Sequence, residues 1–128
     1  MGESDTPFGD LVELQVPASS AYLAVLRTTA ARLAARIGFT LDEIEDLRIA
    51  VDEAGAMLLP LATNGSTMQC SFQLQADVLD VVVSVPATHA ELPGRSSFAW
   101  TVLSALAGEV RSRAEDGRVS IVLRKSRG

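Results

Sequence analysis

The sequence predicts an α+β fold, a two-layer sandwich in which a mostly antiparallel sheet is covered on one face by three helices. Apolar residues with helical spacing occupy three stretches, residues 19–37, 40–60 and 98–110. Apolar residues that alternate with polar ones, or run continuously, occupy four shorter stretches, residues 12–16, 68–74, 78–85 and 119–123. The expected order is therefore β-α-α-β-β-α-β.

The first strand and first helix are separated by a proline. Val12, Leu14 and Val16 alternate with polar residues, and Pro17 ends the strand. Ser19 or Ser20 is the expected helix cap. A single apolar stripe then predicts the buried face of the helix, made of Tyr22, Leu26, Ala30, Leu33 and Ile37. Gly38 suits the left-handed residue that commonly follows a helix.

The second helix begins with a capping-box pattern. Thr40 is followed three residues later by Glu43, so each side chain can bond the other's backbone N–H. Ile44, Leu47, Val51 and Leu58 form its expected buried stripe, and Pro60 marks its end.

The second half of the chain predicts a hairpin, a loop, a helix and a last strand. Ala76–Asp77 is the short turn between two strands, and residues 86–96 form the loop. The third helix is expected to bury Phe98, Val102, Leu106 and Val110, whereas Trp100 is equally consistent with a core or a pocket position. Asp116–Gly117 then turns into the last strand.

Length and charge limit the class of protein. The 128 residues suit one domain, with residues 1–10 as a flexible N-terminus, 11–125 as the folded domain and 126–128 as a tail. A net charge of −5 and an isoelectric point near 4.7 argue against direct nucleic-acid binding. No stretch approaches the roughly 18 apolar residues of a membrane span, and the polar, acidic start lacks the features of a secretory signal. We expect a cytoplasmic protein.

Common catalytic and metal-binding patterns are absent from the sequence. Cys70, the one cysteine, lies on the apolar face of a strand, and His89, the one histidine, lies in a loop, so they form no metal site. We interpret Cys70 as a small core residue and His89 as a solvated one. No G-x-S-x-G, G-x-x-x-x-G-K-[ST] or G-x-G-x-x-G string occurs, which removes the hydrolase and P-loop readings.

One string in the second helix resembles a known family. LRIAVDEAGAMLL, residues 47–59, is similar to the N-box helix L-R-L-A-V-x-E-A-x-x-N-A-x-x-H-A of the GHKL ATPases, specifically the RsbW-like anti-sigma-factor serine kinases. Thr40, Asp42 and Glu43 match the T-x-D-E start of that helix. FAWTVLSALAGEV, residues 98–110, is similar to the family's G-x-G-[LF]-x-[IL] helix, which ends in an acidic residue and valine. The resemblance covers nearly the whole chain and implies a GHKL-like fold.

The resemblance also implies which residues would form an ATP site, and several positions depart from the pattern. Glu53 matches the family's general base, but Met57 stands where an asparagine binds Mg²⁺, and a thioether does not suit that hard cation. The D-x-G-x-G motif after the third strand has no counterpart, because residues 84–93 contain neither Asp nor Gly. In the glycine-rich phosphate lid, Ser97 and Ala99 replace glycines and only Gly94 remains nearby. We therefore expect no cofactor and no efficient phosphotransfer.

Partner binding is the function that the resemblance leaves open. In the family, an arginine of the first helix contacts the sigma factor and the antagonist protein that competes for it, and Arg27 falls at that position. The leading hypothesis is that the protein is an anti-sigma factor, which sequesters a sigma factor until an antagonist displaces it. The resemblance also implies a homodimer, which is usual in the family. One alternative is an active kinase of the antagonist that uses Mg²⁺ and ATP. Another is a small-ligand sensor whose pocket is lined by Met57, Phe98 and Trp100.

Overall fold

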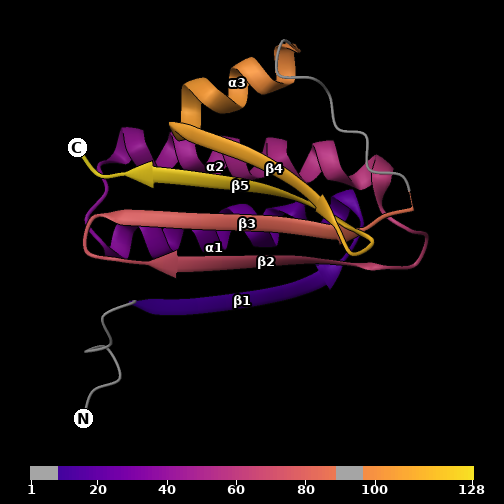
Figure 1. Cartoon of the computed structure of the whole chain (residues 1–128). Coiled ribbons are helices and arrows are strands. Elements are labelled where there is room, and N and C mark those ends of the chain that lie inside the picture. The colour runs from indigo at the N-terminus through magenta and orange to yellow at the C-terminus, as the bar shows by residue number, and fades with distance from the viewer. Residues whose placement is uncertain (1–8, 89–96) are drawn as a thin grey trace.

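A computed structural model describes residues 9–88 and 97–128 (Figure 1). Three helices and five strands follow one another as β1 (Asp10–Pro17), α1 (Leu23–Arg36), α2 (Leu41–Leu58), β2 (Thr67–Leu74), β3 (Val78–Pro86), α3 (Phe98–Ala107), β4 (Glu109–Glu115) and β5 (Arg118–Ser126). Short 3-10 turns at Ser20–Tyr22 and Leu59–Leu61 precede α1 and follow α2. The predicted α+β class is confirmed.

The five strands form one sheet in the order β1-β2-β3-β5-β4, and every neighbouring pair is antiparallel. Side chains of a strand alternate between the two faces, and the register aligns Leu14 with Cys70 and Cys70 with Val83 on the same face. This face is covered by the helices, whereas Gln69, Ser71 and Gln73 lie on the opposite face. The polar residues that alternate along β2 thus lie on the face that the helices leave uncovered.

A single hydrophobic core lies between the sheet and the helices. Its fully buried large side chains come from both layers and include Leu26 of α1, Leu47 and Leu58 of α2, Phe72 of β2 and Leu103 of α3. The core consists mainly of alanine, valine and leucine, with Phe39, Phe72 and Trp100 as its buried aromatic members among the described residues. Such a core is consistent with the aromatic content of the sequence, which is 5%.

Both predicted helix boundaries around residue 40 are confirmed. Gly38 has a φ of +88°, which places it in the left-handed region after α1. The Oγ1 of Thr40 accepts a hydrogen bond from the Glu43 N–H at 3.1 Å, and a Glu43 carboxylate oxygen accepts one from the Thr40 N–H at 2.7 Å. Backbone N–H groups of Thr40 and Gly128 lower the pKa of Glu43 below its ordinary value.

Removal of this cap has a defined cost. We expect Thr40→Ala to lower the free energy of unfolding by about 0.5–2 kcal/mol, because the Glu43 N–H then has no side-chain acceptor. Chemical denaturation at pH 7 measures the loss, and Thr40→Ser serves as the control because it keeps the hydroxyl. Equal losses in the two variants would mean that the methyl group, and not the cap, carries the effect.

The C-terminal third differs from the predicted order by one additional strand. The third helix ends at Ala107 instead of continuing to Val110, because Gly108 adopts a φ of +89°. Glu109–Glu115 then forms β4, which pairs with β5 through the two-residue turn Asp116–Gly117. Both turn residues have positive φ, at +54° and +73°, as a tight hairpin of this kind requires.

The buried faces of the helices also differ from the predicted stripes at two aromatic residues. Phe98 opens α3 and is 83% exposed, so the prediction that it is a core residue is wrong. Trp100 is 4% exposed and belongs to the core, together with Leu103 and Ala107 of the same helix. Tyr22 precedes α1 and is exposed, because the first helical turn is a separate 3-10 turn that rotates it out of the stripe.

Candidate functional site

Helix α2 carries most of the predicted site residues and lies between α1 and α3 (Figure 1). Successive residues of an α-helix are rotated by about 100°, so neighbours in the sequence point in different directions. Asp52 faces α1, because it bonds Arg27 of that helix. Glu53, the next residue, is rotated away from this flank.

Glu53 and Met57 lie one helical turn apart on α2 and therefore share a flank. Both are half-buried. Met57 packs against the hydrophobic core, so its thioether behaves as an apolar filler at this point of the helix. The structure thus brings together the two residues expected at the centre of an ATP site, and the second offers no oxygen.

The N-terminus of α3 is capped by its own chain. Ser97 is the N-cap residue, and its hydroxyl oxygen accepts a hydrogen bond from the backbone N–H of Trp100 at 3.2 Å. Free N–H groups at a helix N-terminus are the groups that bind phosphate, so this bond occupies one donor of the expected phosphate lid. Ala99 lies in the first turn of α3 and is half-buried. Gly94 and His89 lie outside the described residues.

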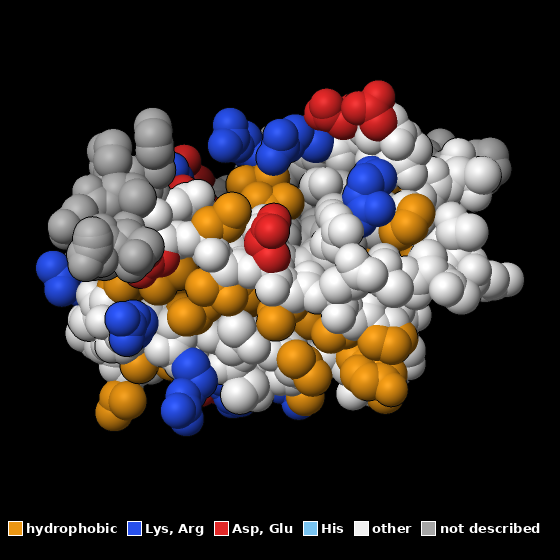
Figure 2. Space-filling view, turned by 90° about the horizontal axis from the view of Figure 1, so that it is seen from below, with side chains coloured by type: hydrophobic (Ala, Val, Ile, Leu, Met, Phe, Trp, Pro, Cys, Tyr) orange, Lys and Arg blue, Asp and Glu red, His pale blue; other side chains and the backbone are white. Residues whose placement is uncertain are grey.

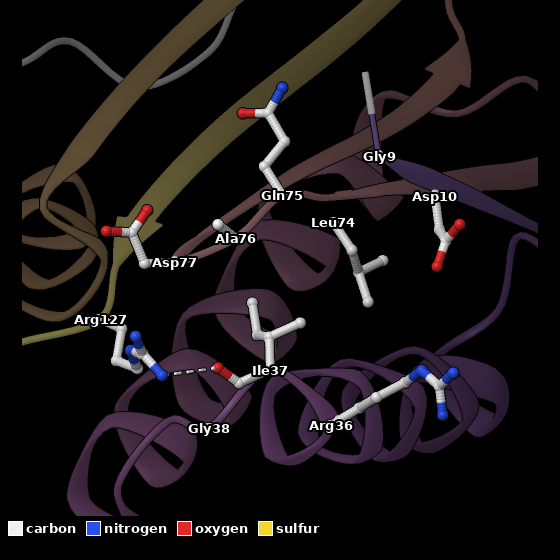
Figure 3. Close-up of a pocket in the computed structure, with 10 residues that line it drawn as sticks. All are labelled: Gly9, Asp10, Arg36, Ile37, Gly38, Leu74, Gln75, Ala76, Asp77 and Arg127. Atoms are coloured by element: carbon white, nitrogen blue, oxygen red, sulfur yellow. Dashed lines mark hydrogen bonds between the residues drawn. The ribbon is translucent and has the colours of Figure 1, made fainter. Parts of the chain in front are cut away.

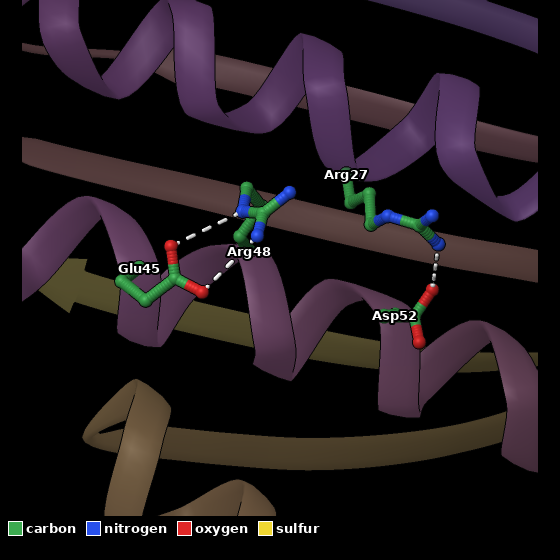
Figure 4. A network of polar contacts seen from close by, with 4 residues as sticks. All are labelled: Arg27, Glu45, Arg48 and Asp52. Carbon is green, nitrogen blue, oxygen red and sulfur yellow. Dashed lines mark hydrogen bonds and ion pairs between the residues drawn. The ribbon is translucent and has the colours of Figure 1, made fainter.

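Arg27 forms an ion pair between α1 and α2 (Figure 4). Its Nη1 donates to Oδ1 of Asp52 at 2.6 Å, across 25 residues of sequence. The side chains of Arg27 and Asp52 are 37% and 40% exposed, so both reach solvent. The residue predicted to contact a partner is therefore accessible and already held by a neighbouring carboxylate.

A second ion pair lies on the same helix one turn earlier. Arg48 donates to both carboxylate oxygens of Glu45, from Nε at 3.3 Å and from Nη2 at 3.1 Å (Figure 4). These hydrogen bonds raise the pKa of Arg48 above its ordinary value. Each of the two arginines therefore bonds its own carboxylate, Arg48 that of Glu45 and Arg27 that of Asp52.

The one cysteine lies in the core, as predicted. Cys70 is 1% exposed on β2, and its removal from water raises the pKa of the thiol to about 12. A thiol with that pKa is almost entirely protonated at neutral pH and reacts poorly as a nucleophile. Among residues 9–88 and 97–128, no group of three or more His, Cys, Asp or Glu side chains is placed to hold a metal ion.

An open groove of about 1060 Å³ lies where β1 begins and α1 ends (Figure 3). Arg36, Arg127, Asp10 and Asp77 contribute charged side chains of both signs to its lining. Met57, Phe98 and Trp100, the residues of the ligand-sensor alternative, do not line it. Trp100 is instead a core residue, and Phe98 is exposed.

Comparisons with known proteins find sequence similarity over part of the chain. No protein-family model matches it. The chain is 40% identical over 76 residues to the serine-protein kinase RsbW of Halalkalibacterium halodurans, a match that covers 59% of this chain and 47% of the relative. It is 51% identical over 45 residues to RsbW of Bacillus subtilis, covering 35% of this chain and 28% of the relative. The chain thus spans about half the length, or less, of these curated relatives.

The fold has a counterpart among solved structures. The crystal structure of the RsbU and RsbW domains of Rv1364c from Mycobacterium tuberculosis superimposes with a TM-score of 0.73 over 92% of this chain and 32% of that chain. The two sequences are 15% identical, so this match concerns the fold alone.

The fold matches that of a solved structure that contains an RsbW domain, and the sequence is similar to RsbW serine-protein kinases over 59% of this chain or less. These similarities confirm the resemblance to RsbW-like proteins that the N-box string predicted. In the described part of the chain no helix is long and apolar enough to cross a lipid bilayer.

The contact between Arg27 and Asp52 was not predicted from the sequence. It joins two helices, so it depends on how α1 packs against α2. Gly55 permits this close packing, because a Cβ at that position would lie 2.6 Å from Cδ2 of Leu23. A glycine inside an amphipathic helix is the sequence signal for such an approach.

Proposed function

We propose that this domain is a cytoplasmic anti-sigma factor that binds and sequesters a sigma factor, is released by an antagonist protein, and phosphorylates neither efficiently. The observation that carries the proposal is the combination of RsbW relatives with a methionine at the position of the Mg²⁺ ligand. Phosphoryl transfer depends almost entirely on positioning and charge stabilisation by metal and lid. A domain that lacks the Mg²⁺ ligand and the phosphate lid can still bind partner proteins through its surface.

Two local contacts support the absence of efficient phosphotransfer. Met57 packs against the hydrophobic core, so a different side chain at this position, placed to bind Mg²⁺, would leave a gap in the packing. The hydroxyl of Ser97 occupies the Trp100 N–H, which a phosphate would otherwise use. Loss of a single electrostatic donor typically lowers a rate by about 10²–10³-fold, and here several departures occur together.

Arg27 is the partner-binding residue in this proposal. Its planar guanidinium suits a carboxylate on a sigma factor or antagonist, and arginine is enriched at interface hot spots. Exposure of 37% leaves it accessible to a partner beside its contact with α2. The acidic net charge of −5 favours a partner with a basic surface around that contact.

We also propose that the domain forms a homodimer through the edge of the molecule made by β1 and α1. Figure 2 views this edge and shows hydrophobic side chains among charged ones of both signs. Leu11, Tyr22 and Val25 are 57%, 42% and 42% exposed, and Leu14 and Leu33 are only partly buried beside them. Among the strands that the structure describes, β1 pairs with β2 alone, and its other edge is where a second copy would add. Sedimentation equilibrium of the purified chain measures the mass in solution.

An active serine kinase of the antagonist remains the second candidate. Two observations favour it, the printed name of the relatives, serine-protein kinase RsbW, and the presence of Glu53 on the same flank as the altered ligand position. This candidate requires Mg²⁺ and ATP, while the leading proposal requires no cofactor.

Thermal melting with Mg²⁺-ATP separates the two candidates. A ligand at about 100 times its dissociation constant stabilises a protein by about 2.7 kcal/mol, which at this size is a shift of several degrees. We expect millimolar Mg²⁺-ATP to leave the melting temperature unchanged relative to Mg²⁺ alone. A clear shift that Glu53→Ala abolishes would contradict the proposal and make phosphorylation of candidate antagonists the next assay.

A further inference from the structure

The Arg27–Asp52 pair has a geometry that leaves part of the arginine unused. One guanidinium nitrogen, Nη1, donates to one carboxylate oxygen at 2.6 Å. A guanidinium has five N–H donors in a planar fork, so the remaining donors are available for a second acceptor. With both side chains more than a third exposed, solvent screens the pair and its contribution to stability is small.

We propose that Asp52 is a positioning residue, which aligns the guanidinium of Arg27 for a carboxylate on the partner protein. This inference rests on the proposed function, because it assigns the role of Asp52 in the same partner contact. The partner chemistry that fits is an exposed Asp or Glu side chain, which can accept two parallel N–H bonds from the free part of the fork.

The physical advantage is a smaller ordering cost on binding. A free arginine on a helix surface samples many rotamers, and a partner that uses it must select one of them. The bond to Asp52 makes that selection before the partner arrives, since α2 holds the acceptor in place. The gain therefore depends on an acceptor oxygen at position 52.

The charge of Asp52 has the opposite effect on an acidic partner. A carboxylate beside Arg27 repels the incoming carboxylate, although exposure and salt weaken this repulsion. Asparagine separates the two effects, because its amide oxygen still accepts the bond while its charge is zero. Positioning therefore predicts different results for Asp52→Asn and Asp52→Ala, whereas a purely ionic role predicts the same result for both.

The chain also contains a matched control on the same helix. Glu45 is an exposed carboxylate that pairs with Arg48, at comparable exposure and one to two turns from Asp52. Glu45→Ala breaks an arginine–carboxylate pair of the same type without touching Arg27. Any general effect of surface charge on α2 appears in this variant.

The test measures the affinity of the full chain for each purified sigma factor of its source organism. We expect Asp52→Ala to weaken the tightest of these complexes by about 3- to 10-fold, the size of one side chain's ordering cost. Asp52→Asn and Glu45→Ala are expected to stay within about twofold of the unchanged chain. An unchanged affinity in Asp52→Ala, or an equal loss in Asp52→Asn, would overturn the inference.

A second measurement keeps the inference separate from the proposed function. The guanidinium NMR signals of Arg27 report its mobility without any partner, and we expect them to be ordered in the unchanged chain and in Asp52→Asn but mobile in Asp52→Ala. If no sigma factor binds while the signals follow this order, the proposed function fails and the alignment stands. If Arg27 is equally mobile in all three proteins, the positioning role is wrong, whatever binds.

Discussion

Trp100→Ala is expected to lower the free energy of unfolding by about 3–5 kcal/mol, the usual cost of truncating a buried aromatic side chain. Trp100 is 4% exposed and is the largest side chain that α3 contributes to the core. Because α3 packs mainly against α2, the gap would loosen the contact between these two helices. A loss of this size is a large part of the stability of a small domain.

Phe98→Ala is the matched control two residues earlier on the same helix. Phe98 is 83% exposed, so its truncation is expected to change the stability by no more than about 0.5 kcal/mol. Urea denaturation of both variants, followed by circular dichroism, measures the difference. Comparable losses would show that Phe98 is buried in solution and would restore the assignment made from its position in the helical stripe.

Arg27→Ala is expected to reduce the affinity for the bound sigma factor by about 30-fold or more, which is a loss of about 2 kcal/mol. The reason is that the aliphatic truncation removes the whole fork of donors from the proposed contact. The stability of the free domain should fall by less than about 1 kcal/mol, since Asp52 is 40% exposed and remains hydrated.

Arg32→Ala on the same helix controls for the loss of positive charge. Arg32 is exposed and takes part in none of the ion pairs among the described residues. Isothermal titration calorimetry of the two variants against one sigma factor gives the comparison. Equal affinities for the Arg27 and Arg32 variants would remove Arg27 from the interface.

Local chemistry explains why much of the fold was predictable. The capping box at Thr40 and the left-handed glycine at position 38 are determined by neighbouring residues, so the boundaries between α1 and α2 follow from short strings. The alternation along β2 similarly predicted which of its side chains face the helices. In each case the stabilising contact lies within a few residues of its signal.

The prediction missed a strand whose side chains are exposed on both faces of the sheet, because such a strand shows no alternation of apolar and polar residues. Strand β4 is an edge strand in which only Val110 is buried, so it lacks the alternating apolar residues by which strands are detected. Two local features indicate this strand. Gly108 ends the preceding helix, and Asp116–Gly117 forms a hairpin turn, which joins two strands. Phe98 was wrongly assigned to the core, because helical spacing shows which residues share a face of a helix but not how far the core extends along that face.

The candidate site was predictable in its residues but not in its contacts. Glu53 and Met57 share a flank by helix geometry, which spacing alone gives. The Arg27–Asp52 bond joins residues 25 positions apart, on two different helices. Pairings of this kind depend on tertiary packing.

The position of α2 between its two neighbours has a consequence for how such domains diverge. One flank of this helix holds Asp52 against α1, and the other holds Glu53 and Met57. The two flanks share a backbone but no side chain. Under the proposed function, a substitution that alters chemistry at Glu53 and Met57 leaves the residues of partner recognition unchanged, so a lineage can discard phosphotransfer while it refines recognition.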